Sequence, residues 1–128
     1  MHPFRAAVEA RDHGAVVDTL APDVLFHSPV AFKPFAGREA VGEVLRAVGD
    51  VFEDFSYTDE LASDGVLALI FRARVGDKAV EGIDVLRFDD DGLIAEFTVM
   101  VRPASALMAL GEAMAPKVEG LAKADAPA

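Results

Sequence analysis

One stretch in the second half of the chain limits the possible folds more than any other. Two runs rich in apolar and β-branched residues, 80–88 and 93–102, flank the sequence Asp-Asp-Asp-Gly at residues 89–92. Glycine adopts the positive φ of a tight turn at no steric cost, and aspartate favours turns. The stretch therefore predicts an antiparallel β-hairpin.

The alternation of side chains along the first strand of this hairpin singles out Asp84. Successive side chains of a strand point to opposite faces, so Asp84 shares a face with Leu86 and Phe88, while Arg87 belongs to the wet face. A carboxyl group on a covered face has a raised pKa and can act as an acid or base near neutral pH. The alternative is a structural role, in which Asp84 hydrogen bonds a buried backbone group or pairs with His27 or an arginine.

The rest of the chain predicts a mixture of helices and strands. Helical spacing of apolar residues occurs over 4–11, 15–20, 37–52 and the segment after Pro103, where Pro116 is expected to interrupt the helix. Alternating patterns predict strands at 24–28, 55–61 and 66–75, in addition to the hairpin. This order favours an α+β fold in which helices pack on the concave face of a curved antiparallel sheet and enclose a pocket. We expect one domain over residues 1–118 and a flexible tail over residues 119–128.

Composition excludes several classes of function. The formal net charge of −10 argues against binding to nucleic acid or to anionic membranes. The absence of cysteine excludes disulfides and thiolate chemistry. The charged N-terminal segment does not resemble a signal peptide, and no run approaches the roughly 18 apolar residues of a membrane span. These features predict a cytoplasmic protein.

His27 is the second candidate for proton transfer. It stands at the end of a predicted strand, directly before Ser28-Pro29, where the mouth of a pocket is expected. The ordinary pKa of histidine, about 6.5, suits acid–base chemistry at neutral pH. The alternative is a histidine at the rim or in the core whose ring nitrogen is satisfied by a structural hydrogen bond. Asp84 and His27 are thus the predicted catalytic pair.

Apolar and aromatic residues set what the predicted pocket would accept. The candidates for ligand contact are Phe32, Phe35, Tyr57, Phe71, Leu86, Phe97 and Met108. A pocket of this kind fits a small hydrophobic molecule with one or two oxygens, although each residue also suits simple core packing. The three histidines have no metal-ligand spacing, the triple aspartate lacks the spacing of a calcium loop, and no nucleotide-binding motif occurs. We expect neither a metal nor a cofactor.

Three stretches together resemble a known superfamily. They are Leu-Ala-Pro-Asp-Val-Leu-Phe at 20–26, Phe-Ala-Gly-Arg-Glu-Ala-Val at 35–41, and the hairpin from Gly82 to Glu96. In this combination the chain resembles the nuclear transport factor 2-like superfamily, in particular its SnoaL-like and ketosteroid-isomerase-like branches. The resemblance implies a cone-shaped fold around a hydrophobic cavity, commonly dimeric through the sheet. Members include isomerases, cyclases, dehydratases, epoxide hydrolases and non-enzymatic binders.

The resemblance also shows which enzyme residues are missing. Ser28 stands where ketosteroid isomerases have their catalytic aspartate, and Phe4 where they have the oxyanion-hole tyrosine. Asp84 matches one aspartate of limonene epoxide hydrolases, but Gly82 replaces their arginine and Val99 their second aspartate. Neither set of catalytic residues is complete.

The function expected from the sequence is therefore a SnoaL-like small-molecule-pocket protein. If it is an enzyme, we expect cofactor-free proton transfer of the isomerase, cyclase or dehydratase type on an apolar carbonyl compound, with Asp84 and His27 as acid and base. The alternatives are a non-catalytic binder of a hydrophobic metabolite and a dimeric scaffold without ligand. A homodimer would use the outer face of the sheet, with contacts at Ala68, Ile70, Val85, Thr98 and Met100.

Overall fold

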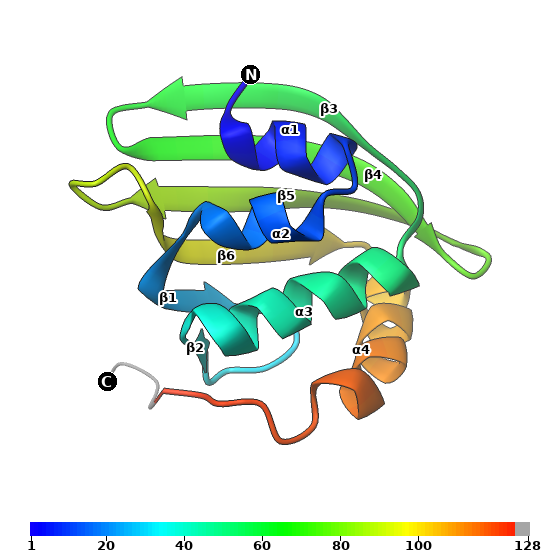
Figure 1. Ribbon diagram of the computed structural model, residues 1–128. Coiled ribbons are helices and arrows are strands. Elements are labelled where there is room, and N and C mark those ends of the chain that lie inside the picture. Colours follow the sequence, from blue (N-terminus) through cyan, green and yellow to red (C-terminus); the bar gives the residue numbers. More distant parts are fainter. Residues whose placement is uncertain (125–128) are drawn as a thin grey trace.

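Residues 1–124, the part described by the computed structural model, form a six-stranded curved sheet with four helices (Figure 1). The order of strands across the sheet is β2-β1-β6-β5-β4-β3. The strands are β1 (Leu20–His27), β2 (Phe35–Ala36), β3 (Glu53–Ser63), β4 (Val66–Val75), β5 (Lys78–Phe88) and β6 (Ile94–Arg102). This confirms the predicted α+β class and the central hairpin, which is formed by β5 and β6.

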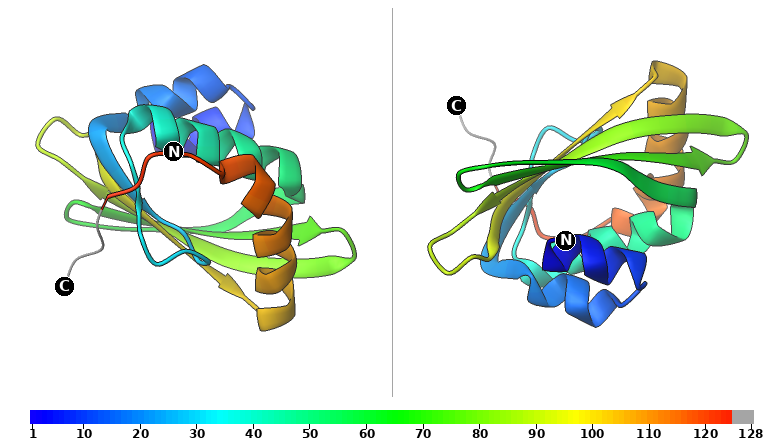
Figure 2. Two further views of the ribbon diagram at one scale, coloured as in Figure 1. Left: turned by 90° about the horizontal axis from the view of Figure 1, so that it is seen from below. Right: turned by 90° about the horizontal axis from the view of Figure 1, so that it is seen from above.

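The helices gather on the concave side of the sheet, as both views of Figure 2 show. They are α1 (Pro3–Glu9), α2 (His13–Asp18), α3 (Arg38–Val51) and α4 (Ala104–Val118). In α3 the buried residues Val41 and Val44 lie on one face, as the helical spacing predicted. Within residues 1–124 none of the helices is long and apolar enough to cross a membrane.

Two details of the predicted elements are wrong. The sheet is not wholly antiparallel, because β1 runs parallel to β6. Parallel neighbours require a long connection, and α3 and four further strands separate these two along the chain. The last helix is not interrupted at Pro116 but continues to Val118. Proline removes one backbone hydrogen bond in the final turn, where water can take its place because Pro116 and its neighbours on either side are exposed.

The register of the central strands determines what faces the helices. Asp84 of β5 lies between Leu69 of β4 and Val99 of β6. On the same face of β5, Gly82 lies opposite Phe71 of β4. Residues directly opposite in an antiparallel pair share a face, so these side chains all belong to the concave side.

The described part of the predicted tail is attached to the body of the fold. The backbone of residues 122–124 hydrogen bonds with that of residues 34–36, with N···O distances of 3.0 and 2.9 Å. The amino group of Lys123 lies 4.8 Å from the ring centroid of Phe35. The segment expected to be flexible over 119–128 therefore extends the edge of the sheet as far as residue 124, and residues 125–128 lie outside the described residues.

Candidate functional site

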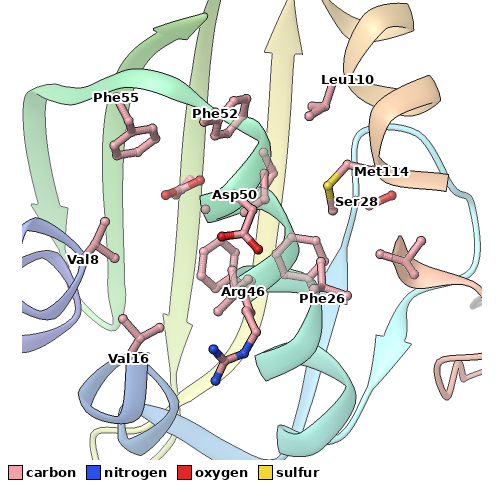
Figure 3. A pocket seen from close by; sticks show the side chains of 18 of the residues that line it. Val8, Val16, Phe26, Ser28, Arg46, Asp50, Phe52, Phe55, Leu110 and Met114 are labelled. Carbon is pink, nitrogen blue, oxygen red and sulfur yellow. The ribbon is translucent and has the colours of Figure 1, made fainter. Parts of the chain in front are cut away.

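A cavity of about 1400 Å³ lies between the concave face of the sheet and helices α1, α3 and α4 (Figure 3). Its aromatic lining consists of Phe4, Phe26, Phe35, Phe52, Phe55, Tyr57, Phe71 and Phe97. Cavities that hold drug-sized ligands usually measure about 300–1,000 Å³. The volume is thus sufficient for a molecule of several rings. Charged side chains such as Arg46 and Asp50 also line it, and both are exposed on α3.

Asp84 is the buried acid of this cavity. Its side chain points to the covered face, as the alternation along the strand predicted, and the residue is only 7% exposed. Among residues 1–124 it is the one charged residue that is buried. Burial favours the uncharged carboxyl and raises the pKa of Asp84 to about 7, while a hydrogen bond from Tyr57 has a smaller, opposite effect.

Tyr57 of β3 is the hydrogen-bonding partner of Asp84. Its hydroxyl donates to Oδ2 of Asp84 over 3.4 Å. Burial and the nearby Asp84 carboxylate raise the pKa of Tyr57 above its ordinary value, so this hydroxyl keeps its proton. The distance exceeds the usual 2.5–3.0 Å of an O–H···O bond, which makes the interaction weak.

The pair provides acid–base chemistry in an apolar environment. Near pH 7 both the protonated and the ionised forms of Asp84 are populated, so the same group can donate or accept a proton. Tyr57 supplies a second, permanent donor beside it. Within the described residues, no group of three or more histidine, aspartate or glutamate side chains is arranged to hold a metal ion.

His27 lies on the other face of the sheet. Phe26 of the same strand points into the cavity, so the following residue points outward. There, Nε2 of His27 lies 3.1 Å from a carboxylate oxygen of Glu96 on β6. The structure thus corrects the expectation that His27 and Asp84 face one ligand. The alternation of β1 residues would have revealed this placement.

Four of the predicted ligand contacts line the cavity: Phe35, Tyr57, Phe71 and Phe97. The lining also includes Phe52 and Phe55, which the sequence analysis did not select. Phe55 carried a usable signal, because it alternates in phase with Tyr57 along β3.

The other three predicted contacts lie elsewhere. Phe32 is 84% exposed in the loop before β2, where no periodic pattern indicates direction. Met108 is 66% exposed, because it lies off the face of α4 that buries Ala106 and Leu110. Leu86 is fully buried, but in the packed core and not in the cavity lining. Their predicted placement in the cavity is therefore corrected.

Three residues that stand where related enzymes have catalytic groups also line the cavity. Phe4 and Val99 contribute apolar surface to its wall. Ser28 lines it too, and its hydroxyl accepts hydrogen bonds from the backbone N–H groups of Val30 and Ala31, at 3.2 and 2.8 Å. These contacts give Ser28 a role in the turn at the cavity edge. Asp84 and Tyr57 are left as the buried polar groups of the lining.

Comparison with known proteins identifies chains of similar sequence and shape. The family model of the SnoaL-like domain matches residues 2–97. The crystal structure of a steroid delta-isomerase from Pseudomonas aeruginosa is similar with a TM-score of 0.85 and 46% sequence identity, over 90% of this chain and 85% of that chain. No curated protein matches the sequence.

Two further crystal structures extend the comparison. An uncharacterized protein with a cystatin-like fold from Silicibacter pomeroyi has a TM-score of 0.87 and 33% identity, over 92% of this chain and 84% of that chain. A candidate SnoaL-like polyketide cyclase from Shewanella denitrificans has a TM-score of 0.65 and 13% identity, over 86% of this chain and 92% of that chain. The latter is a likeness of fold alone.

Proposed function

The chain belongs to the SnoaL-like domain family, within the nuclear transport factor 2-like superfamily, and from this we propose that it is a cofactor-free proton-transfer enzyme acting on an apolar carbonyl compound. The observation that carries the proposal is a buried carboxyl group next to a tyrosine hydroxyl, in a cavity lined by aromatic rings. Burial raises the pKa of this carboxyl group to about 7. The similarity to a steroid delta-isomerase supports a ring-containing carbonyl substrate.

Asp84 and Tyr57 divide the proposed chemistry between them. Ionised Asp84 removes a proton from the carbon next to the carbonyl, and the electron pair moves onto the carbonyl oxygen. Protonated Asp84 then returns the proton to another carbon, which completes an isomerisation without any co-reactant. When substrate binds, the Tyr57 hydroxyl, which keeps its proton, turns its O–H from Asp84 to the substrate and donates to the oxygen that gains charge. Because His27 is engaged with Glu96 on the outer face, the proposal gives it no part in this chemistry.

Turnover of a library of cyclic ketones and enones tests this proposal. We expect Asp84→Asn to lower kcat/KM by at least about 100-fold, the usual contribution of a general acid or base. We expect Tyr57→Phe to lower kcat/KM by about 100-fold, because the donor to the oxygen that gains charge is lost. Asp77→Asn, in the exposed turn before β5, is the matched control and should leave turnover unchanged. Equal rates in the wild type and Asp84→Asn would remove Asp84 from the chemistry.

A second candidate function is non-catalytic binding of an apolar metabolite. It is favoured by the serine and phenylalanine that stand where ketosteroid isomerases have their catalytic groups, since Phe4 and Ser28 give the cavity no additional acid. This function predicts a ligand that raises the melting temperature and is recovered chemically unchanged. The turnover assay separates the two functions, because a binder gives stabilisation without product.

We also propose that two copies associate through the outer face of the sheet. Ile70 and Val85 are only partly buried there, and Met100 is 56% exposed. Sedimentation equilibrium should show a dimer, and Val85→Lys should shift it toward monomer by placing a charge in the apolar contact. A wild-type chain that sediments as a monomer at high protein concentration would contradict the proposed association.

A further inference from the structure

We propose that Arg5 is a positioning residue that holds the ring of Tyr57 so that its hydroxyl reaches Asp84. This inference rests on the proposed function, because it concerns the same pair of groups. The guanidinium carbon of Arg5 lies 5.5 Å from the centroid of the Tyr57 ring, within the range of a cation–π contact. Arg5 belongs to α1, so this contact connects the first helix to the site.

Arg5 is itself held by two carboxylates. Its Nη1 lies 3.2 Å from Oε1 of Glu60 on β3, and its Nε lies 3.4 Å from Oε2 of Glu9, one turn further along α1. The Arg5 side chain is only 21% exposed. These two contacts oppose movement of the planar guanidinium away from the ring face.

The Tyr57 ring is fixed between this cation and a second aromatic ring. Phe55 meets it edge-on, with the centroids 4.9 Å apart and the planes at 87°. The hydroxyl at the end of the ring reaches Asp84 over a long hydrogen bond of 3.4 Å. A small rotation of the ring would therefore break the bond, and the contacts with Arg5 and Phe55 oppose that rotation.

The charged groups around Tyr57 and Asp84 allow the effect of Arg5 on this pair to be isolated. Tyr57 is influenced by Arg5, Glu9 and Asp84, and among these Arg5 is the one that lowers its pKa. Asp84 is influenced by its own burial and by the Tyr57 hydroxyl. An effect of Arg5 that passes through the Tyr57 hydroxyl is lost in Tyr57→Phe, whereas a direct effect of its charge on Asp84 persists there.

A double-mutant cycle read by carboxyl ¹³C NMR tests the proposal. The Asp84 resonance is identified by its loss in Asp84→Asn and is titrated in the wild type, Arg5→Met, Tyr57→Phe and the double variant. We expect Tyr57→Phe to raise the titration midpoint by about 0.5–1 pH unit, the equivalent of one hydrogen bond to the ionised form. Arg5→Met should give at least about half of that rise. In the Tyr57→Phe background, Arg5→Met should not raise the midpoint further. Arg5→Lys, which keeps the cation, should give a midpoint between those of Arg5→Met and the wild type.

Two results would overturn the proposal. If Arg5→Met raises the midpoint of Asp84 equally in the wild type and in Tyr57→Phe, Arg5 acts by its charge alone. If Arg5→Met does not raise the midpoint in the wild type, Arg5 has no influence on Tyr57 and Asp84. Should Arg5→Met fail to fold, Glu60→Gln provides the same test, because it loosens Arg5 without removing the cation. The titration needs no substrate. An inactive protein that shows the coupling refutes only the proposed function, and an active protein without coupling refutes only the role of Arg5.

Discussion

Replacing Asp84 with asparagine is expected to make the protein increasingly more stable than the wild type as the pH rises to about 7. The pKa of Asp84 is about 7 in the folded protein, against an ordinary value of 3.8. The folded state therefore holds a proton that the unfolded state has released, and the wild type loses stability with rising pH between these two values. About three pH units at 1.36 kcal/mol each amount to a loss of about 4 kcal/mol above pH 7. Asparagine, which is neutral at every pH, escapes this loss.

Urea unfolding of Asp84→Asn and the wild type at pH 5.5, 6.5, 7.5 and 8.5 measures the difference in their unfolding free energies. All four pH values lie above the isoelectric point near 4.6. Between pH 5.5 and 7 the wild type should lose roughly 2 kcal/mol of its unfolding free energy, because this free energy falls by about 1.36 kcal/mol per pH unit. The difference in unfolding free energy should then remain constant to pH 8.5. Asp77→Asn, at an exposed position, should follow the wild type throughout. A constant difference between Asp84→Asn and the wild type at all four values would contradict a buried, protonated Asp84.

Replacing Gly82 with alanine is expected to destabilise the protein by about 3 kcal/mol, the upper end of the usual cost of overpacking. A Cβ atom at position 82 would lie 2.3 Å from Cζ of Phe71, whose ring covers the glycine. The ring cannot move freely, because it packs against Phe52 and Phe55 with centroids 5.5 and 5.1 Å apart. Gly82 is thus required for the close approach of Phe71 across the sheet, next to Asp84.

Two further variants separate this clash from a general effect of alanine. Gly49→Ala in α3 meets no atom within 4 Å and should stabilise the helix by about 0.5–1 kcal/mol. Phe71→Leu is expected to lose stability by itself, but to cost less in the Gly82→Ala background, since the smaller side chain leaves room for the methyl group. Additive effects of the two substitutions would mean that the ring does not fill the space above Gly82.

The elements of the fold that depend on local pattern could be predicted from the sequence. The turn at residues 89–92 and the two apolar runs specified the β5–β6 hairpin, and the period of two placed Asp84 on its covered face. The helical spacing of Val41 and Val44 likewise identified the buried side of α3. In each case the determining residues lie within a few positions of one another.

The partners in the site could not be predicted, because they depend on register between strands. Tyr57 reaches Asp84 across β4, past a bulge that shifts the β3–β4 pairing between Tyr57 and Asp59. No local pattern indicates such a bulge. The two-residue strand β2 and its pairing with residues 122–124 are equally non-local. His27 is a different case, because the alternation that places Asp84 also holds in β1, where Phe26 faces the cavity and His27 the outer face.

The charge state of Asp84 connects the fold to the proposed chemistry. The aromatic lining makes the cavity apolar, and the apolar cavity keeps a carboxyl group protonated up to neutral pH. A more exposed aspartate would be fully ionised at pH 7 and would be a weak base. The same burial thus underlies both the pH dependence of stability that we expect and the proposed reactivity.

Titration of the Asp84 carboxyl group in the wild-type protein, followed by ¹³C NMR without any ligand, tests this account most directly. We predict a single midpoint at about pH 7 for the resonance that is lost in Asp84→Asn. A midpoint near 4, the value of an aspartate in water, would show that the side chain is solvated and would contradict the account.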